Sequence, residues 1–276
     1  MTRSEFPSAD RIVFGMVPQS DRLETRARLN DLCSALSREA GYPIAPHRAP
    51  SPEALAMAMR QERLHIAWVS ALLYAQSDVV SKTIPMLSSV RQGSATYHSV
   101  LYARADSSMR SVEQLRGAKA AWVSPTSASS YLVPRVSLQR RGIALDRAIR
   151  EEAFLGSHAA VARAVAERQA DIGATYAIFE HGDARRRMVR AGFLEIDDGA
   201  PMHVLDVAGP IPADLIVAAP TNTDGWMRQR IADAFVRVMR DAACARLVRE
   251  LIGAEDFQPF SADELRPLRE LMSPTP

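Results

Sequence analysis

Short apolar runs alternate with longer amphipathic segments in the first quarter of the chain. The pattern predicts strands at 11–17 and 64–70, helices at 22–40 and 52–62, and a short strand between the two helices. The first helix ends where Gly and Pro follow it, in the sequence GYP. Because strands and helices alternate, the order βαβαβ indicates the start of a doubly wound lobe.

A second set of the same kind begins near Tyr97. We expect strands over YHSVLYAR, AKAAWVS and DIGATY, a short helix over SVEQLRG, a helix ending near Arg141, and amphipathic helices at 157–170 and 224–252. The Pro-rich segment GPIPADL is expected to return the chain to the first lobe. The pattern therefore predicts an α/β protein of two lobes, each a mostly parallel sheet flanked by helices. The predicted division is 1–95 for the first part of lobe 1, 96–207 for lobe 2, and 208–276 for the return to lobe 1 and the C-terminal helices.

The composition is ordinary for a globular protein, with 47% hydrophobic and 24% charged residues and a net charge of +2. The 34 basic residues are interleaved with 32 acidic ones, and only Lys82 and Lys119 among them are lysines. We interpret the basic run ARRRMVR, at 184–190, as a solvated helix face. No nucleic-acid partner is therefore expected.

No segment approaches the ~20 continuous apolar residues of a membrane span. The N-terminal residues also lack the apolar core of a secretory signal. We expect a protein that is not integral to a membrane: cytoplasmic if Met1 is the native start, and periplasmic or membrane-associated if an export signal has been removed. Cys33 and Cys244 are isolated and are interpreted as free thiols, and no motif indicates a metal site or a cofactor.

One stretch departs from its surroundings: SPTSASSYLVP, at 124–134, places Thr126, Ser127, Ser129 and Ser130 just before a helix-like run. One Ser or Thr satisfies one or two of the unpaired N–H groups at a helix N-terminus. Four hydroxyls exceed that need, and all can donate to one acceptor-rich ligand at the positive end of the helix. The plainer alternative is an N-cap with small neighbours; the number of donors favours an oxyanion site.

Other polar and aromatic residues fall where open α/β sheets bind ligands. His158 starts the helix at 157–170, where the helix macrodipole favours a neutral imidazole. Trp68 and Ser70 end a strand of the first lobe. Trp68 and Tyr97 also suit a core, and His158 also suits a helix surface. The predicted ligand-binding residues are Tyr97, Thr126, Ser127, Ser129, Ser130, His158, Trp68, Ser70, Tyr176 and Gln19.

The ordered series of motifs resembles a known family. The series is similar to that of the periplasmic phosphonate-, phosphate- and phosphite-binding proteins of ABC transporters. Its motifs are, in order, FGMVPQ, RQERLHIAWVS, YHSVLYAR, SVEQLRGAKAAWVSPTSASSYLVP, GSHAAVARAVAERQADIGATY and GPIPADLIV. The resemblance covers most of the chain and implies the type II periplasmic-binding-protein fold, with a ligand cleft between the lobes. It also implies that phosphonate oxygens are bound by Ser127, Ser129, His158 and Tyr97.

The chain departs from the family pattern at four positions. Ala128 stands where Thr is usual, which removes a hydroxyl but leaves a backbone N–H, and Ser130 replaces a Gly. Pro52 falls near the position of a ligand-facing Tyr, and His65 stands where an Asp commonly precedes IAW. We therefore expect weaker phosphonate binding, or a preference for a different or larger oxyanion.

The resemblance implies a non-catalytic solute-binding protein that closes over a small oxyanion (phosphonate, phosphate, phosphite or similar). We expect a monomer with an ABC permease as partner. The alternatives are an enzyme on the same fold acting on a small anionic metabolite, or a cytoplasmic ligand sensor. An enzyme needs an activated nucleophile or an acid–base pair, and no Asp or Glu is evidently placed to orient His158. If the ligand carries an amine, Asp206 and Glu180 are the candidate carboxylates.

Overall fold

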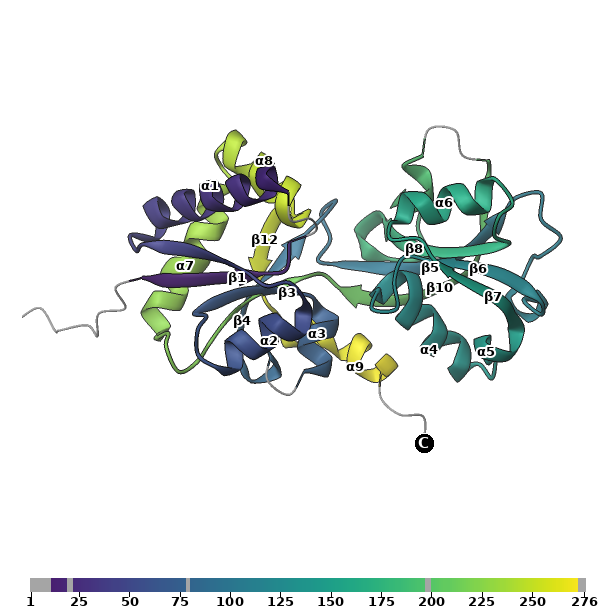
Figure 1. Cartoon of the computed structure of the whole chain (residues 1–276), viewed down its shortest axis with the longest axis horizontal. Helices are drawn as coiled ribbons and strands as arrows, with labels where there is room; N and C mark the ends of the chain where they lie inside the picture. Colours follow the sequence, from purple (N-terminus) through teal and green to yellow (C-terminus); the bar gives the residue numbers. More distant parts are fainter. Residues whose placement is uncertain (1–10, 19–21, 78–79, 197–199, 273–276) are drawn as a thin grey trace, which may run out of the picture. The chain divides into compact units, whose positions relative to one another are not determined.

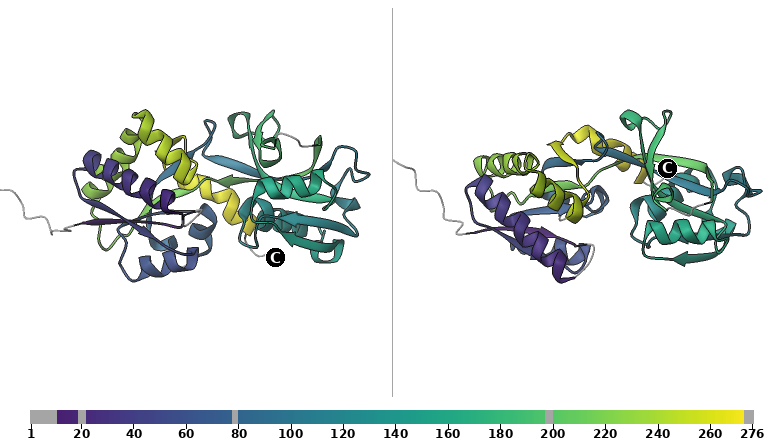
Figure 2. Two further views of the ribbon diagram at one scale, coloured as in Figure 1. Left: turned by 45° about the horizontal axis from the view of Figure 1, so that its top comes forward. Right: turned by 90° about the horizontal axis from the view of Figure 1, so that it is seen from above.

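The computed structural model describes residues 11–18, 22–77, 80–196 and 200–272. The chain divides into two compact units: unit 1 comprises the residues up to Arg91 with Ala213–Ser261, and unit 2 comprises Gln92–Pro212 with the segment that begins at Ala262. Figure 1 shows both units, and Figure 2 shows them from two further directions.

The sheet of unit 1 has the strand order β12-β4-β11-β3-β1-β2. Helices α1, α7 and α8 cover one face of it, and α2 and α3 lie on the other (Figure 1). The strands are β1 (Ile12–Met16), β2 (Ile44–Arg48), β3 (Ile66–Val69), β4 (Ile84–Val90), β11 (Leu215–Ala218) and β12 (Asp256–Pro259), and the helices are α1 (Leu23–Ala40), α2 (Pro52–Arg60), α3 (Ala71–Gln76), α7 (Gly225–Val238) and α8 (Ala242–Ile252).

The core of unit 1 follows from the periodicity of these segments. The predicted stripe of α1 is buried, with Leu32 and Leu36 fully inaccessible. Phe14 of β1 meets Phe235 of α7 edge to face, with ring centroids 5.7 Å apart. On the opposite face, Gly15 leaves room for α2, because a Cβ there would lie 3.0 Å from a methyl group of Leu55.

The sheet of unit 2 has the strand order β10-β5-β8-β6-β7, and β9 pairs with β8. Helix α6 covers one face, and α4 with α5 lies on the other (Figure 1). The strands are β5 (Thr96–Arg104), β6 (Ala118–Trp122), β7 (Ile149–Phe154), β8 (Ile172–Phe179), β9 (Met188–Ala191) and β10 (Met202–Pro212), and the helices are the π-helix η3 (Ala128–Leu132), α4 (Val133–Arg140), α5 (Leu145–Ala148), α6 (His158–Ala166) and α9 (Arg266–Met272).

The strand directions differ from the expected mostly parallel sheets. Each sheet has a parallel part, β2-β1-β3 in unit 1 and β8-β6-β7 in unit 2. The remaining pairs, including β11 with β3 and β5 with β8, are antiparallel. Both sheets are therefore mixed: β11 and β5, which arrive from the other unit, run in the reverse direction, and so do β12 and β9, which do not.

Two other expectations need correction. The single helix predicted at 224–252 is two helices, because Asp241 ends the first run and caps α8, accepting the Cys244 N–H at 2.8 Å. The segment 184–190 is not a helix face: it leads into β9, and its arginines form ion pairs, including Arg185 with Asp183 at 2.9 Å.

The C-terminal helix also differs from the expected division, which assigned all of 208–276 to lobe 1. Helix α9 packs on β10 and α4 of unit 2, where Leu268 is fully buried. The guanidinium of Arg140 donates to the carbonyl of Glu270 and ties α9 to the end of α4. An apolar stripe shows that a helix is buried but not against which sheet.

Candidate functional site

The hydroxyl-rich loop follows β6 in unit 2 and leads directly into a helix. Ser127 is the N-cap of η3, and its Oγ accepts the Ser130 N–H at 3.2 Å. The carbonyl of Ser127 accepts the N–H groups of both Tyr131 and Leu132, at 3.1 and 3.0 Å, which starts the chain in a π-turn before α4 continues it. Such single π-turns occur frequently at functional sites.

The four hydroxyl residues of the loop have different surroundings. Ser130 is fully buried, and its Oγ accepts the Val123 N–H at 2.9 Å, so it anchors the loop to the end of β6. Thr126 is exposed, with its Oγ1 3.3 Å from Ser124 Oγ. Ser129 is buried at 5% exposure, and its carbonyl accepts the Ser99 hydroxyl at 2.6 Å. Ser130 therefore has a structural role in the loop, and its ligand contact stays a prediction from the sequence.

Val123 joins this helix start to a second one. Its carbonyl accepts the Gly156 N–H at 2.9 Å, just ahead of Ser157, which caps α6 by accepting the Ala160 N–H at 3.2 Å. One residue at the end of β6 thus holds the N-termini of η3 and α6 beside each other. Both ends carry partial positive charge and outward-facing N–H groups.

The two helix starts share an electrostatic property. Among the described helices of eight residues or more, with η3 and α4 taken as one run, only these two begin without an acidic cap or an acidic residue in the first turn. The others begin with Glu24, Glu53, Asp224 or Asp241 in such positions. No carboxylate of their own therefore neutralises the paired N-termini.

His158 is the first residue of α6 and is partly buried. Its Nδ1 lies 2.8 Å from Thr175 Oγ1, and its ring meets that of Tyr176 edge to face at 4.9 Å. Burial lowers the pKa of His158 from 6.5 to about 4, against the opposing charge of Glu195. The imidazole is therefore neutral at pH 7, as the sequence indicates, although burial is the larger cause.

Tyr176 belongs to a polar group that the sequence did not reveal. Its hydroxyl hydrogen bonds to Glu195, whose carboxylate also accepts from Arg190 Nε at 2.6 Å. Arg190 and Glu195 come from β9 and the turn after it, and nothing in the sequence pattern singles them out. Glu195 is close enough to act on the charge of His158, but its recorded hydrogen bonds are to Tyr176 and Arg190, and the residue bonded to the imidazole is Thr175.

Tyr97 and Tyr176 lie on the face of the sheet that η3 contacts. Tyr97 is two residues before Ser99 on β5, so both side chains point to one face, and Ser99 is the direct cross-strand partner of Tyr176. The structure therefore brings together within unit 2 the hydroxyl loop, His158, Tyr176 and the strand that carries Tyr97.

Two of the remaining predicted residues, Trp68 and Ser70, belong to unit 1. Trp68 packs against the core, and Ser70 caps α3 by accepting the Leu73 N–H at 3.1 Å. Gln19 lies outside the described residues.

The two candidate carboxylates for an amine are each paired with an arginine. Asp206 accepts from Arg141 Nη1 at 2.6 Å, just past the C-terminal end of α4. The run from η3 to α4 places that end roughly 18 Å from the N-terminus, at about 1.5 Å per residue. Glu180 follows β8 and accepts from Arg187 Nε at 2.8 Å.

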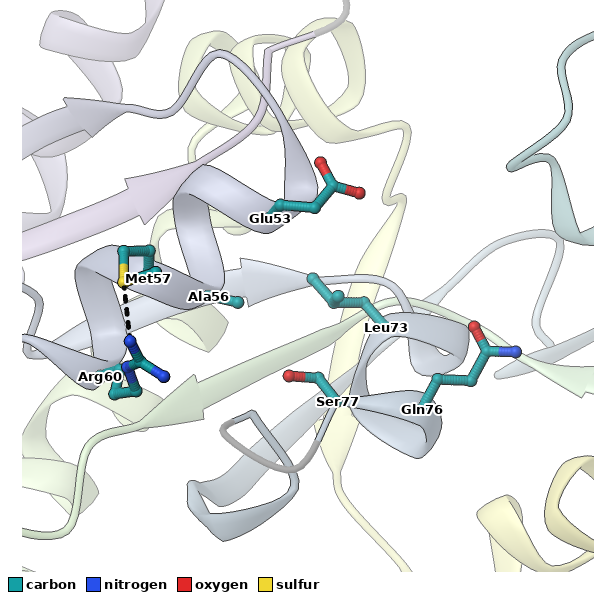
Figure 3. A pocket seen from close by; sticks show the side chains of 7 residues that line it. All are labelled: Glu53, Ala56, Met57, Arg60, Leu73, Gln76 and Ser77. Carbon is teal, nitrogen blue, oxygen red and sulfur yellow. Dashed lines mark hydrogen bonds between the residues drawn. The ribbon is translucent and has the colours of Figure 1, made fainter.

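A pocket lies between α2 and α3 of unit 1 (Figure 3). Its lining is mainly apolar, with the Glu53 carboxylate near one end and the Arg60 guanidinium near the other, where Arg60 donates to Met57 Sδ at 3.4 Å. The lining residues are Glu53, Ala56, Met57, Arg60, Leu73, Gln76 and Ser77. This set includes none of the predicted ligand-binding residues.

Two α/β units, each a mixed sheet covered by helices, have the fold of the type II periplasmic-binding-protein class. Solved structures share this fold along 95% of the chain. Examples are the protein XAC2383 from Xanthomonas citri with bound ATP (22% identity, TM-score 0.70, 96% of its length) and a binding component of an ABC phosphonate transporter from Pseudomonas aeruginosa (21%, 0.67, 85%). PhnD1 from Prochlorococcus marinus in complex with methylphosphonate is a third (14%, 0.65, 97%).

Residues 14–265 match the family described as the periplasmic substrate-binding protein of phosphonate ABC transporters, and the chain belongs to this family. The resemblance seen in the sequence is thereby confirmed, as are the fold class and the expectation of a non-catalytic solute-binding component rather than an enzyme. Members of such a family work with a small ligand and a permease. Within the part of the chain that the structure describes, no helix is both long and apolar enough to cross a bilayer.

Proposed function

We propose that this chain binds a phosphonate or a closely related small oxyanion at the paired N-termini of η3 and α6 and delivers it to an ABC permease. The observation that carries the proposal is that Val123 joins these two helix starts, neither of which has an acidic residue in its own cap or first turn. An anion there gains from both helix dipoles and from N–H groups that the helices cannot use.

The proposed contacts are hydroxyl and N–H groups rather than arginines. Ser127, Ser129 and Thr126 supply hydroxyls, Ala128 supplies a backbone N–H, and His158 supplies an imidazole N–H. Arg190 is the cation of this group, and Glu195 already pairs with it at 2.6 Å. Tyr97 and Tyr176 are the proposed aromatic contacts, while Trp68, Ser70 and Gln19 stay predictions from the sequence alone.

Ligand chemistry beyond the anion follows from the surroundings of the loop. Phe154 is 43% exposed and its ring lies 5.2 Å from that of Tyr131, which belongs to η3. An organic substituent could therefore rest on aromatic surface beside the anion site. We infer that the ligand is an oxyanion with an organic group, which distinguishes it from free phosphate.

Calorimetry on the purified chain tests the proposal with methylphosphonate, aminoethylphosphonate, phosphate, phosphite, a small sulfonate and ATP. We expect at least one organic phosphonate or phosphate ester to bind more tightly than phosphate. A chain that binds none of these six, after denaturation and refolding to remove any copurified ligand, would refute the proposal.

The finer expectations on partner, location and assembly belong to the same proposal. We infer a periplasmic location from the family, a permease that recognises the loaded protein, and a monomeric state. Fractionation of cells that express the full native gene product, followed by sedimentation analysis, tests location and assembly together. A cytosolic or stably dimeric protein would contradict that part of the proposal.

A further inference from the structure

The imidazole of His158 has one ring nitrogen engaged inside the protein. Its Nδ1 lies 2.8 Å from the Oγ1 of Thr175, whose side chain is fully buried in β8. Among the residues that the structure describes, this is the one hydrogen bond recorded for Thr175 Oγ1. The geometry permits either atom to be the donor.

The Thr175 hydroxyl must itself donate a hydrogen bond, and this need decides which of the two atoms is the donor. If Nδ1 carried the proton and donated to Oγ1, the O–H of Thr175 would need a second acceptor, and none is recorded within the described residues. A buried donor without an acceptor costs about 1–3 kcal/mol. If the hydroxyl donates to Nδ1, both groups are satisfied and the imidazole proton must sit on Nε2.

The packing around the pair keeps the ring in one orientation. Gly192 leaves space for it: a Cβ at that position would lie 2.9 Å from the His158 Cβ and would collide with Thr175 Oγ1. The Tyr176 ring stands perpendicular to the imidazole at 4.9 Å, and Glu195 and Arg190 hold Tyr176 in place. The ring therefore has little freedom to flip and exchange its nitrogens.

We propose that Thr175 is a positioning residue: its hydroxyl donates to Nδ1 of His158 and so holds the imidazole proton on Nε2, where it is a donor for the bound oxyanion. An acceptor lone pair at Nε2 would instead repel the negative oxygens. The ligand half of this inference rests on the proposed function, whereas the tautomer half concerns the free protein alone.

The tautomer is measured by two-bond ¹H–¹⁵N correlation spectra of the free protein at pH 7, with the His158 signals assigned by their loss in His158→Gln. Wild type should show a protonated Nε2 and an unprotonated Nδ1. Thr175→Val keeps the side-chain shape without the hydroxyl, so it should give a mixture of tautomers, while Thr175→Ser should restore the wild-type pattern. A protonated Nδ1 in wild type, or an unchanged tautomer in Thr175→Val, overturns the assignment.

If Thr175→Val fails to fold, Gly192→Ala is a second variant that should remove the hydrogen bond between Thr175 and Nδ1 of His158. Its methyl group would push the Thr175 hydroxyl away from Nδ1, so the tautomer mixture should reappear although the threonine is intact. A wild-type tautomer in folded Gly192→Ala counts against the proposal.

The binding half is measured by calorimetry with methylphosphonate. Thr175→Val should weaken binding roughly five-fold or more, as for the loss of one hydrogen bond, and Thr175→Ser should stay near wild type. If the tautomers behave as expected but neither Thr175→Val nor His158→Gln changes the affinity, the donor role of His158 is overturned and the tautomer assignment stands. If wild type itself does not bind any tested oxyanion, the proposed function fails instead.

Discussion

The turn before α2 in unit 1 and the turn before η3 in unit 2 both carry a serine N-cap, and Ser51 and Ser127 each accept a backbone N–H at 3.2 Å. In unit 1 the cap is followed by Pro52 and Glu53, so one N–H group is absent and a carboxylate lies at the positive end of the helix. In unit 2 the cap is followed by Ala128 and Ser129, and no acidic residue occurs in the first turn.

The difference shows how a structural cap can be told from a binding site. At a purely structural cap, side chains of the same turn accept the free N–H groups and balance the positive end of the helix dipole, as Ser51 and Glu53 do. The turn in unit 2 has more hydroxyls than the cap consumes and leaves the dipole uncompensated. Its second helix start, at His158, lies beside the first because both are bonded to Val123.

The largest expected effect concerns the acid stability of unit 2. Burial lowers the pKa of His158 to about 4, from 6.5. Below pH 6.5 the His158 imidazole is therefore protonated in the unfolded chain, whereas in the folded unit it stays neutral down to about pH 4. The part of the free energy of unfolding that is present above pH 6.5 is lost as the pH falls from 6.5 to 4. The loss is roughly 3 kcal/mol by the free energy of a pKa shift. Denaturant unfolding of wild type and His158→Gln between pH 7 and 4 should show a shallower decline for the variant. Parallel declines would contradict the burial of His158.

The next effect tests the surplus hydroxyls directly. Ser127→Ala and Ser129→Ala should each weaken phosphonate binding by about 1.5–3 kcal/mol, as for hydrogen bonds to a charged group. Ser51→Ala is the matched control, because it removes a cap with the same geometry from unit 1 and should leave the affinity unchanged. If calorimetry finds the same affinity for all three variants, the claim that the turn before η3 binds the ligand and the turn before α2 does not is wrong.

A smaller effect concerns the free energy of unfolding when either of the two serine caps is removed. Ser51→Ala should lower the free energy of unfolding by about 1 kcal/mol, the usual cost of losing an N-cap. Ser127→Ala should cost a similar amount without ligand, since its Oγ also caps a helix. Thermal melts of the free proteins measure both. A stabilised Ser127→Ala protein would mean that the cap geometry is strained.

The smallest effect adds a donor instead of removing one. Ala128→Thr restores the hydroxyl that the family pattern has at this position, and it should tighten phosphonate binding by about 1 kcal/mol. Ala128→Val is the control of matched shape and should not tighten it. Equal affinities of Ala128→Thr and wild type would indicate that this side chain points away from the ligand.

Much of the molecule could be predicted from residues that are near each other in the chain. The stripe of α1, the strand β3, the cap at Ser127 and the start of α6 at His158 follow from spacing and from hydroxyl residues before apolar runs. The order of these motifs also sufficed to indicate the family. These features depend on local hydrogen bonding and on side-chain periodicity, which are properties of short segments.

Other features depend on which segments meet in space. Thr175, Gly192 and Glu195 surround His158 because β8 pairs with β9, and no local pattern predicts that pairing. The antiparallel strands, the place of α9 and the pairing of Asp206 with Arg141 are decided in the same way. The sequence by itself determined which residues begin helices and can donate to an anion. Only the tertiary structure decided that two of those helix starts are bonded to Val123, that the Ser130 side chain anchors the loop, and that burial keeps His158 neutral. The physical reason is that burial and hydrogen bonding across strands arise only when distant segments pack together.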